Sequence, residues 1–176
     1  MDGLTCSEGN GGFHFGSDLD VHVFGVDDLP TREGGAEDDH GTASCFGSQR
    51  IRLSKGQFTT TVPHFTAKTR LFTAVADPQN ALDRSFKHTM ELLQGYGRKP
   101  VGDPKGYSTR TMVMKCQQNV TDTFPMTTCF WANYSAVGSI DFFPPNGEHV
   151  PLDQAAERTR TFATAALSTQ PATAAP

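Results

Sequence analysis

The sequence predicts an α+β fold in which an antiparallel sheet and two helices form two layers, with both helices packed on one face of the sheet. Strand-type segments come in two pairs, and each pair is followed by a segment with helical spacing of apolar residues, which gives the order β-β-α-β-β-α. The longest strand-forming run, residues 115–143, also contains two of the four cysteines and the single tryptophan. Helices on one face of an antiparallel sheet would bury these patterns.

The chain of 176 residues is long enough for one compact domain. Residues 1–47 are rich in glycine and acidic side chains and have few aliphatic residues outside 21–26. Such a segment buries little apolar area against its chain entropy, so we expect a flexible leader with one marginal strand at residues 20–26. The α+β domain is then expected at 48–168, and a disordered tail rich in Pro, Ala and Thr at 169–176.

The first half of the domain contains two expected strands and a helix. Alternating residues predict strands at 50–62 and 69–76, separated by a turn at Pro63. Asp77 followed by Pro78 is typical of a helix start, and Gly95 with Gly97 is typical of its end. Between them, apolar residues recur at helical spacing and predict one buried stripe, formed by Leu82, Phe86, Met90 and Leu93.

The second half repeats the pattern after an expected loop at 97–107, which is rich in Gly and Pro and carries a basic cluster of Arg98, Lys99 and Lys105. A strand is expected at 109–118, a turn at 119–126 and one long strand at 127–143. Leu152 and Asp153 predict the start of the second helix, with Asp153 as its N-cap. Its expected inner face is formed by Ala155, Thr159, Phe162, Ala163 and Ala166.

Cys116 and Cys129 lie on the two strands of the second pair, which a short turn joins. Antiparallel pairing would place them nearly opposite each other, so we expect a disulfide if the domain lies outside the cytoplasm; buried thiols are the alternative. A bridge closing this loop would stabilise the fold by about 3 kcal/mol. Cys6 and Cys45 lie in the expected leader, where they could pair or stay free.

Composition and motifs exclude several classes of function. The formal net charge is −4 and no lysine- and arginine-rich surface is evident, which argues against nucleic-acid binding. The chain shows neither a signal peptide nor an apolar run of about 18 residues, so we expect membrane association only through an anchor that this chain lacks. No metal-ligand spacing, cofactor motif or catalytic constellation stands out, so we expect no metal, no cofactor and no enzymatic activity.

Four segments together resemble a group of actinobacterial, Streptomyces-type proteins that have a membrane or lipoprotein anchor and an extracytoplasmic domain. The segments are TRLFTAVADPQNALDRSF, GRKPVGDPKGYSTRTMVMKCQQ, CFWANYSAVGSI and PLDQAAERTRTF, within residues 65–167. In this group two cysteines bracket a short loop, a tryptophan follows the second, and a glycine precedes a final helix opened by an acidic residue. The matching residues here are Cys116, Cys129, Trp131, Gly138 and Asp153.

The resemblance implies a cell-envelope location but no activity. The group commonly continues after its tryptophan with an Ala-Asp-His-Ser/Thr-type sequence, whereas residues 132–136 here are Ala-Asn-Tyr-Ser-Ala. A role that depended on that acid and imidazole is therefore not expected to carry over. Location in the envelope implies a protein or small-molecule partner there.

Three functions remain as hypotheses. The leading one is a non-catalytic extracytoplasmic sensor or interaction domain of the cell envelope. The second is a small-ligand or lipid-binding carrier, whose cavity Phe72, Phe86, Trp131 and Phe142 would line. The third is a hydrolase-like enzyme whose site is assembled from distant residues, for example Asp141, Glu148 and His149.

Overall fold

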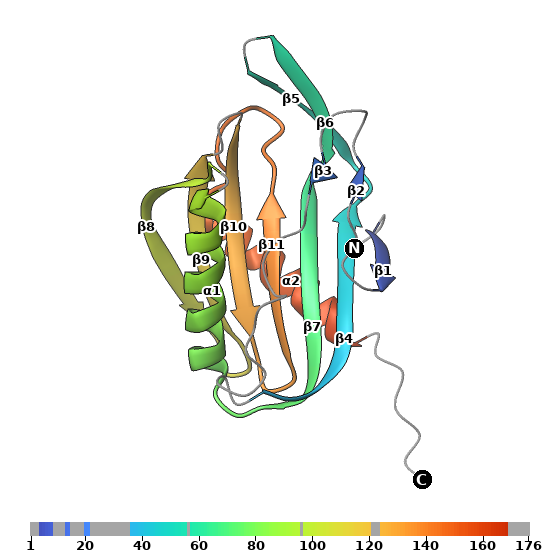
Figure 1. Ribbon diagram of the computed structural model, residues 1–176, viewed down its shortest axis with the longest axis vertical. Helices are drawn as coiled ribbons and strands as arrows, with labels where there is room; N and C mark the ends of the chain where they lie inside the picture. The colour runs from blue at the N-terminus through green and yellow to red at the C-terminus, as the bar shows by residue number, and fades with distance from the viewer. Residues whose placement is uncertain are drawn as a thin grey trace.

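The computed structural model describes residues 4–8, 13–14, 20–21, 36–55, 57–95, 97–120 and 124–168. Its centre is a seven-stranded sheet with the strand order β1-β4-β7-β11-β10-β9-β8, and every neighbouring pair is antiparallel (Figure 1). Its strands are β1 (Leu4–Glu8), β4 (Ala36–Gly47), β7 (Phe65–Val75), β8 (Lys99–Ser108), β9 (Val113–Val120), β10 (Pro125–Ala132) and β11 (Ala136–Phe142).

Two helices and two small sheets complete the described structure. The helices are α1 (Pro78–Gly95) and α2 (Leu152–Ser168). The small sheets pair β2 (Phe13–His14) with β3 (Asp20–Val21), and β5 (Arg50–Lys55) with β6 (Phe58–Pro63). The α+β class and the antiparallel sheet are therefore confirmed. None of the described helices is long and apolar enough to cross a membrane.

The helices lie on opposite faces of the sheet, so the predicted two-layer arrangement is wrong. Both helices contact β9, β10 and β11, with α1 in front of the sheet and α2 behind it in Figure 1. The cause is that the central strands carry large buried side chains on both sides. In β10, Phe130 packs in one cluster with Leu82 of α1, whereas Trp131 packs in another with Ala163 of α2. Residues adjacent in a strand point to opposite faces, so each face needs its own helix.

The sheet begins earlier in the chain than expected. Residues 36–47, placed in the leader by their composition, form β4, which pairs with β7 along most of its length. Backbone hydrogen bonds to the central strand β7 stabilise this segment despite its low apolar content. Ser44 and Cys45 are buried there. The predicted order β-β-α-β-β-α therefore omits strands, and the expected domain boundary between 47 and 48 falls at the end of β4. The rest of the expected leader, apart from residues 4–8, 13–14 and 20–21, and the expected tail lie outside the described residues.

The expected long strand 127–143 is a hairpin of β10 and β11. Asn133 forms the turn: its side-chain oxygen accepts hydrogen bonds from the N–H groups of Ser135 and Ala136, at 2.9 and 2.7 Å. Asparagine stabilises turns through such local bonds. One predicted strand thus becomes two neighbours in the middle of the sheet.

The segment expected as a loop at 97–107 is largely strand β8, which forms one edge of the sheet. Its pairing with β9 is interrupted by a register shift between Val101 and Lys105, and almost all of its residues are exposed. Pro100 and Pro104 lie in this strand. Edge strands tolerate proline and irregular pairing because one side makes no ladder hydrogen bonds, which explains why the Gly and Pro content was misleading.

The ends of α1 confirm the predicted signals. The Asp77 side chain accepts a hydrogen bond from the Asn80 N–H at 3.0 Å, as an N-cap does. At the other end Gly97, with φ of 81°, and Arg98 donate their N–H groups to the carbonyls of Gln94 and Leu93, the pattern of a Schellman motif. The left-handed glycine turns the chain back toward the sheet and directs Arg98 against it.

The start of α2 differs from the prediction in one respect. The first helical residue is Leu152, and the Ala155 N–H donates to the Pro151 carbonyl at 2.9 Å, so Asp153 lies in the first turn and is not the N-cap. The predicted inner face is confirmed for its central residues, since Ala155, Thr159, Phe162 and Ala163 are buried.

Candidate functional site

A cavity of about 530 Å³ lies where the β5–β6 hairpin, the start of β7 and the loop before α2 meet. Gln49 and Ile51 come from the start of the hairpin, His64 from the residue between β6 and β7, and Gln154 and Arg158 from one side of α2. Most of the loop 143–151 completes the wall. The size falls in the range of small-molecule sites. We call this cavity the hairpin pocket.

Buried apolar side chains contribute to the lining of the hairpin pocket. Ile51, Phe143 and Val150 line it and are otherwise buried in the core. The loop that carries the last two is fixed at both ends: the Phe143 N–H donates to the His64 carbonyl at 3.0 Å, and the Thr127 hydroxyl donates to the Val150 carbonyl at 2.7 Å. This part of the lining is therefore preformed.

Two histidines also line the hairpin pocket, each with one ring nitrogen already engaged. His64 Nδ1 lies 3.2 Å from the Gln49 carbonyl oxygen, and His149 Nε2 lies 2.8 Å from the Asn119 carbonyl oxygen. A carbonyl can only accept, so these nitrogens carry the protons. In the neutral rings, His64 Nε2 and His149 Nδ1 keep a lone pair and can accept a hydrogen bond from a ligand.

The charged groups of the hairpin pocket are Arg158 and Glu148, both exposed. The Arg158 guanidinium lies over the Phe142 ring, 5.4 Å from its centroid, and makes no ion pair within the described part of the chain. Its neighbour along the helix, Arg160, is paired with Glu157. Stacking on an aromatic face orients a guanidinium while its N–H donors stay available.

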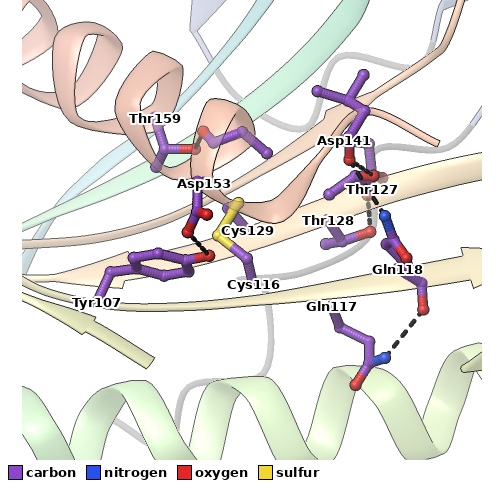
Figure 2. Close-up of a disulfide and its surroundings, with 12 residues drawn as sticks. Tyr107, Cys116, Gln117, Gln118, Thr127, Thr128, Cys129, Asp141, Asp153 and Thr159 are labelled. Atoms are coloured by element: carbon purple, nitrogen blue, oxygen red, sulfur yellow. Dashed lines mark hydrogen bonds between the residues drawn. A yellow bond between two sulfur atoms is a disulfide. The ribbon is translucent and has the colours of Figure 1, made fainter. Parts of the chain in front are cut away.

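The predicted disulfide is present between Cys116 and Cys129, which are directly opposite in the β9–β10 register. Both residues are fully buried, and the bridge lies between the sheet and α2 (Figure 2). Cys6 and Cys45, for which the sequence allowed either a disulfide or free thiols, also form a disulfide. It joins β4 to β1, the edge strand farthest from β8. Cys6 is exposed in this second bridge.

The four aromatic residues expected to line a carrier cavity lie on both faces of the sheet. Phe72 and Phe86 belong to the cluster under α1, whereas Trp131 and Phe142 belong to clusters under α2. They therefore do not line one cavity. Trp131 is fully buried against Gly138, and its indole N–H has no hydrogen-bond partner among the described residues.

The distant residues considered for an enzyme are only partly brought together. Glu148 and His149 both line the hairpin pocket, but Asp141 does not. Asp141 is buried in β11 and forms a two-point ion pair with Arg98, at 3.2 and 3.3 Å. A carboxylate engaged in this way does not orient an imidazole.

The Arg98–Asp141 pair belongs to a buried polar network that the sequence did not reveal. The Thr128 hydroxyl donates to Asp141 at 2.5 Å and accepts from the Asn119 amide at 3.2 Å. Asn119 also supplies the carbonyl that holds His149, so the network reaches the wall of the hairpin pocket. The one available signal was an aspartate inside the apolar run SIDFF. Arg98, grouped with the loop lysines by sequence, is in fact buried.

Lys68 is a further buried charged residue, and the sequence analysis did not single it out. It is 1% exposed, at the middle of β7, and the register places Ser44 of β4 and Ser139 of β11 on either side of it. Both serines are buried. Ser139 lies opposite Phe130 in the β10–β11 register, so these three polar residues form a row on the same face of the sheet as Phe130.

Lys105 and Asp153, which the sequence placed in a loop and at a helix cap, meet Tyr107 at the rim of the sheet. The Lys105 ammonium and the Tyr107 hydroxyl both donate to one Asp153 carboxylate oxygen at 2.8 Å, and Figure 2 shows the tyrosine bond. The bond from Lys105, then that from Tyr107, holds the pKa of Asp153 below its ordinary value. Burial, then the bond to Asp153, raises the pKa of Tyr107.

No group of three or more His, Cys, Asp or Glu side chains in the described ranges is arranged to hold a metal ion. Comparison with known proteins adds no assignment: no family model, no curated protein and no solved structure matches this chain. The hairpin pocket is therefore the candidate functional site on its geometry alone.

Proposed function

We propose that this chain is a non-catalytic, extracytoplasmic sensor domain of the cell envelope that binds a small molecule in the hairpin pocket. The single observation that carries the binding function is the pocket itself, a cavity of about 530 Å³ lined by buried apolar side chains and by Arg158, which forms no ion pair with the described residues. A few polar groups in a mostly preformed concave site are typical of ligand binding.

The disulfides support the extracytoplasmic location. Cys116–Cys129 and Cys6–Cys45 join neighbouring strands near both edges of the main sheet. Disulfides of this structural kind form and persist in oxidising compartments and are rare in the cytosol. The resemblance to anchored actinobacterial proteins points to the same place, and the partner would then be a molecule outside the membrane.

Alkylation of the protein recovered from its own cells tests the location. Denatured, unreduced protein should show no reactive thiol by mass spectrometry, and four after reduction, because all four cysteines are paired. A Cys116→Ser/Cys129→Ser variant should be less stable by about 3 kcal/mol in denaturant melts. Recovery of the native protein with Cys116 and Cys129 reduced would remove the argument for an oxidising compartment.

A further inference from the structure

We infer that the ligand of the hairpin pocket is a small organic anion, with an apolar body and one carboxylate or phosphate head. The inference rests on the proposed binding function and adds the chemical class of the ligand. It depends on three features of the pocket: a guanidinium with no ion pair to the described residues, buried apolar lining side chains and two histidines with fixed tautomers.

Arg158 supplies the recognition of the anionic head. Its guanidinium is oriented by Phe142 and has no carboxylate partner in the described residues, so its N–H donors are free for a ligand. Guanidinium groups bind carboxylate and phosphate oxygens in a planar two-point geometry. Glu148, the acidic residue of the lining, is exposed on the loop and forms no ion pair with Arg158.

The apolar part of the lining favours an apolar body rather than a bare inorganic ion. Ile51, Phe143 and Val150 present buried side chains to the pocket, and three prolines of the loop extend this surface. A cavity of this size exceeds the needs of a single phosphate. Burial of apolar ligand surface here adds to the interaction with the head.

The histidines select for a hydroxyl on the ligand. Because backbone carbonyls hold the protons on His64 Nδ1 and His149 Nε2, the other nitrogen of each neutral ring can accept a hydrogen bond from a ligand O–H. A hydroxylated aromatic acid combines all three features. This makes 4-hydroxybenzoate a suitable probe, with 4-hydroxybenzamide as its neutral counterpart of nearly the same shape.

The test is titration of the ¹⁵N-labelled full chain with each probe, followed by two-dimensional NMR. We expect 4-hydroxybenzoate to give saturable shifts of the amide signals of residues 143–158, and 4-hydroxybenzamide to bind roughly 10-fold more weakly or worse. Phenyl phosphate should bind at the same signals, and inorganic phosphate should bind more weakly than phenyl phosphate because it lacks the apolar body.

Two variants of the same helix provide the decisive control. Arg158→Gln should abolish the preference for the acid over the amide, whereas Arg160→Gln should retain it, because Arg160 pairs with Glu157. Glutamine is a good helix former, so both variants should fold. Equal binding of acid and amide, or a preference that survives in Arg158→Gln, overturns the anion assignment while leaving the pocket as a binding site. Absence of saturable pocket shifts with every probe overturns both.

Discussion

The two faces of the central strands bury different chemistry against similar helices. Under α2, the strands present the Cys116–Cys129 disulfide, Trp131 and Phe142, and α2 meets them with small residues such as Ala155 and Ala163. Under α1, the same strands present an apolar patch around Phe130 and, beside it, the Arg98–Asp141 network.

The difference shows what each face requires. The apolar face, under α2, is stabilised by packing and a covalent bridge. The stability lost on substitution there therefore follows the change in side-chain volume. The polar part of the α1 face depends on the Arg98–Asp141 pair keeping both partners, because an unpaired buried charge is far more costly than a lost contact. Three predictions test this contrast, from the largest expected effect to the smallest.

Asp141→Ala should destabilise the protein by about 3–5 kcal/mol, since it leaves the buried Arg98 guanidinium without its carboxylate. The free energy of unfolding from urea melts measures this. The matched double variant Arg98→Met/Asp141→Leu should lose less than Asp141→Ala, because no unpaired charge remains. A loss below about 1 kcal/mol in Asp141→Ala would show that this face is not held by charge pairing.

Gly138→Ala tests the packing of the other face. A Cβ at this position would lie 2.5 Å from two ring atoms of Trp131, whose side chain is fully buried and cannot move away freely. Overpacking of this kind costs roughly 1–3 kcal/mol.

Gly95→Ala is the control for this change, since an added Cβ there meets no atom within 4 Å. It should leave the free energy of unfolding unchanged or slightly higher, because alanine favours the last turn of α1. If the two glycine variants have equal stability, the tight contact at Trp131 does not exist in solution.

The smallest effect is expected at the rim of the apolar face, in the titration of Tyr107. Its raised pKa means that its contribution to stability is fully present below the ordinary tyrosine value of about 10, and is lost as the pH rises through the folded-state pKa. Asp153→Asn removes the accepting carboxylate and should lower the pKa of Tyr107. Ultraviolet absorbance during a pH titration, corrected with a Tyr107→Phe variant, reads this directly. An unchanged titration in Asp153→Asn would contradict the observed hydrogen bond as a cause.

Local signals allowed much of the fold to be predicted. The start and end of α1 follow from Asp77 and Gly97, and the pairing of Cys116 with Cys129 follows from their positions in adjacent strands. The periodicity of α1 and α2 marks which side of each helix is buried. It does not say which face of the sheet that side meets, so the opposite placement of the helices was not predictable from it.

The elements that were missed depend on partners far away in the chain. Residues 36–47 form a strand because β7 pairs with them, and β8 forms against β9 despite its prolines. The hairpin pocket combines residues from three separated segments, 49–51, 64 and 143–158, and Arg98 meets Asp141 across 43 positions. Neither the spacing of residues along the chain nor its composition indicates which distant residues come into contact. Among the missed features, only the turn at Asn133 could have been predicted from local chemistry, since asparagine between two apolar runs favours a turn.

The irregular edge strand β8 has a consequence for behaviour at high concentration. Pro100 and Pro104 offer no N–H to an incoming strand. The register shift between Val101 and Lys105 makes the edge irregular, so it is a poor surface for pairing with a strand of another molecule. The exposed side chain of Lys99 adds like-charge repulsion between copies. Strand-by-strand polymerisation is thereby blocked on this side, so crowded molecules should resist fibril growth through β8.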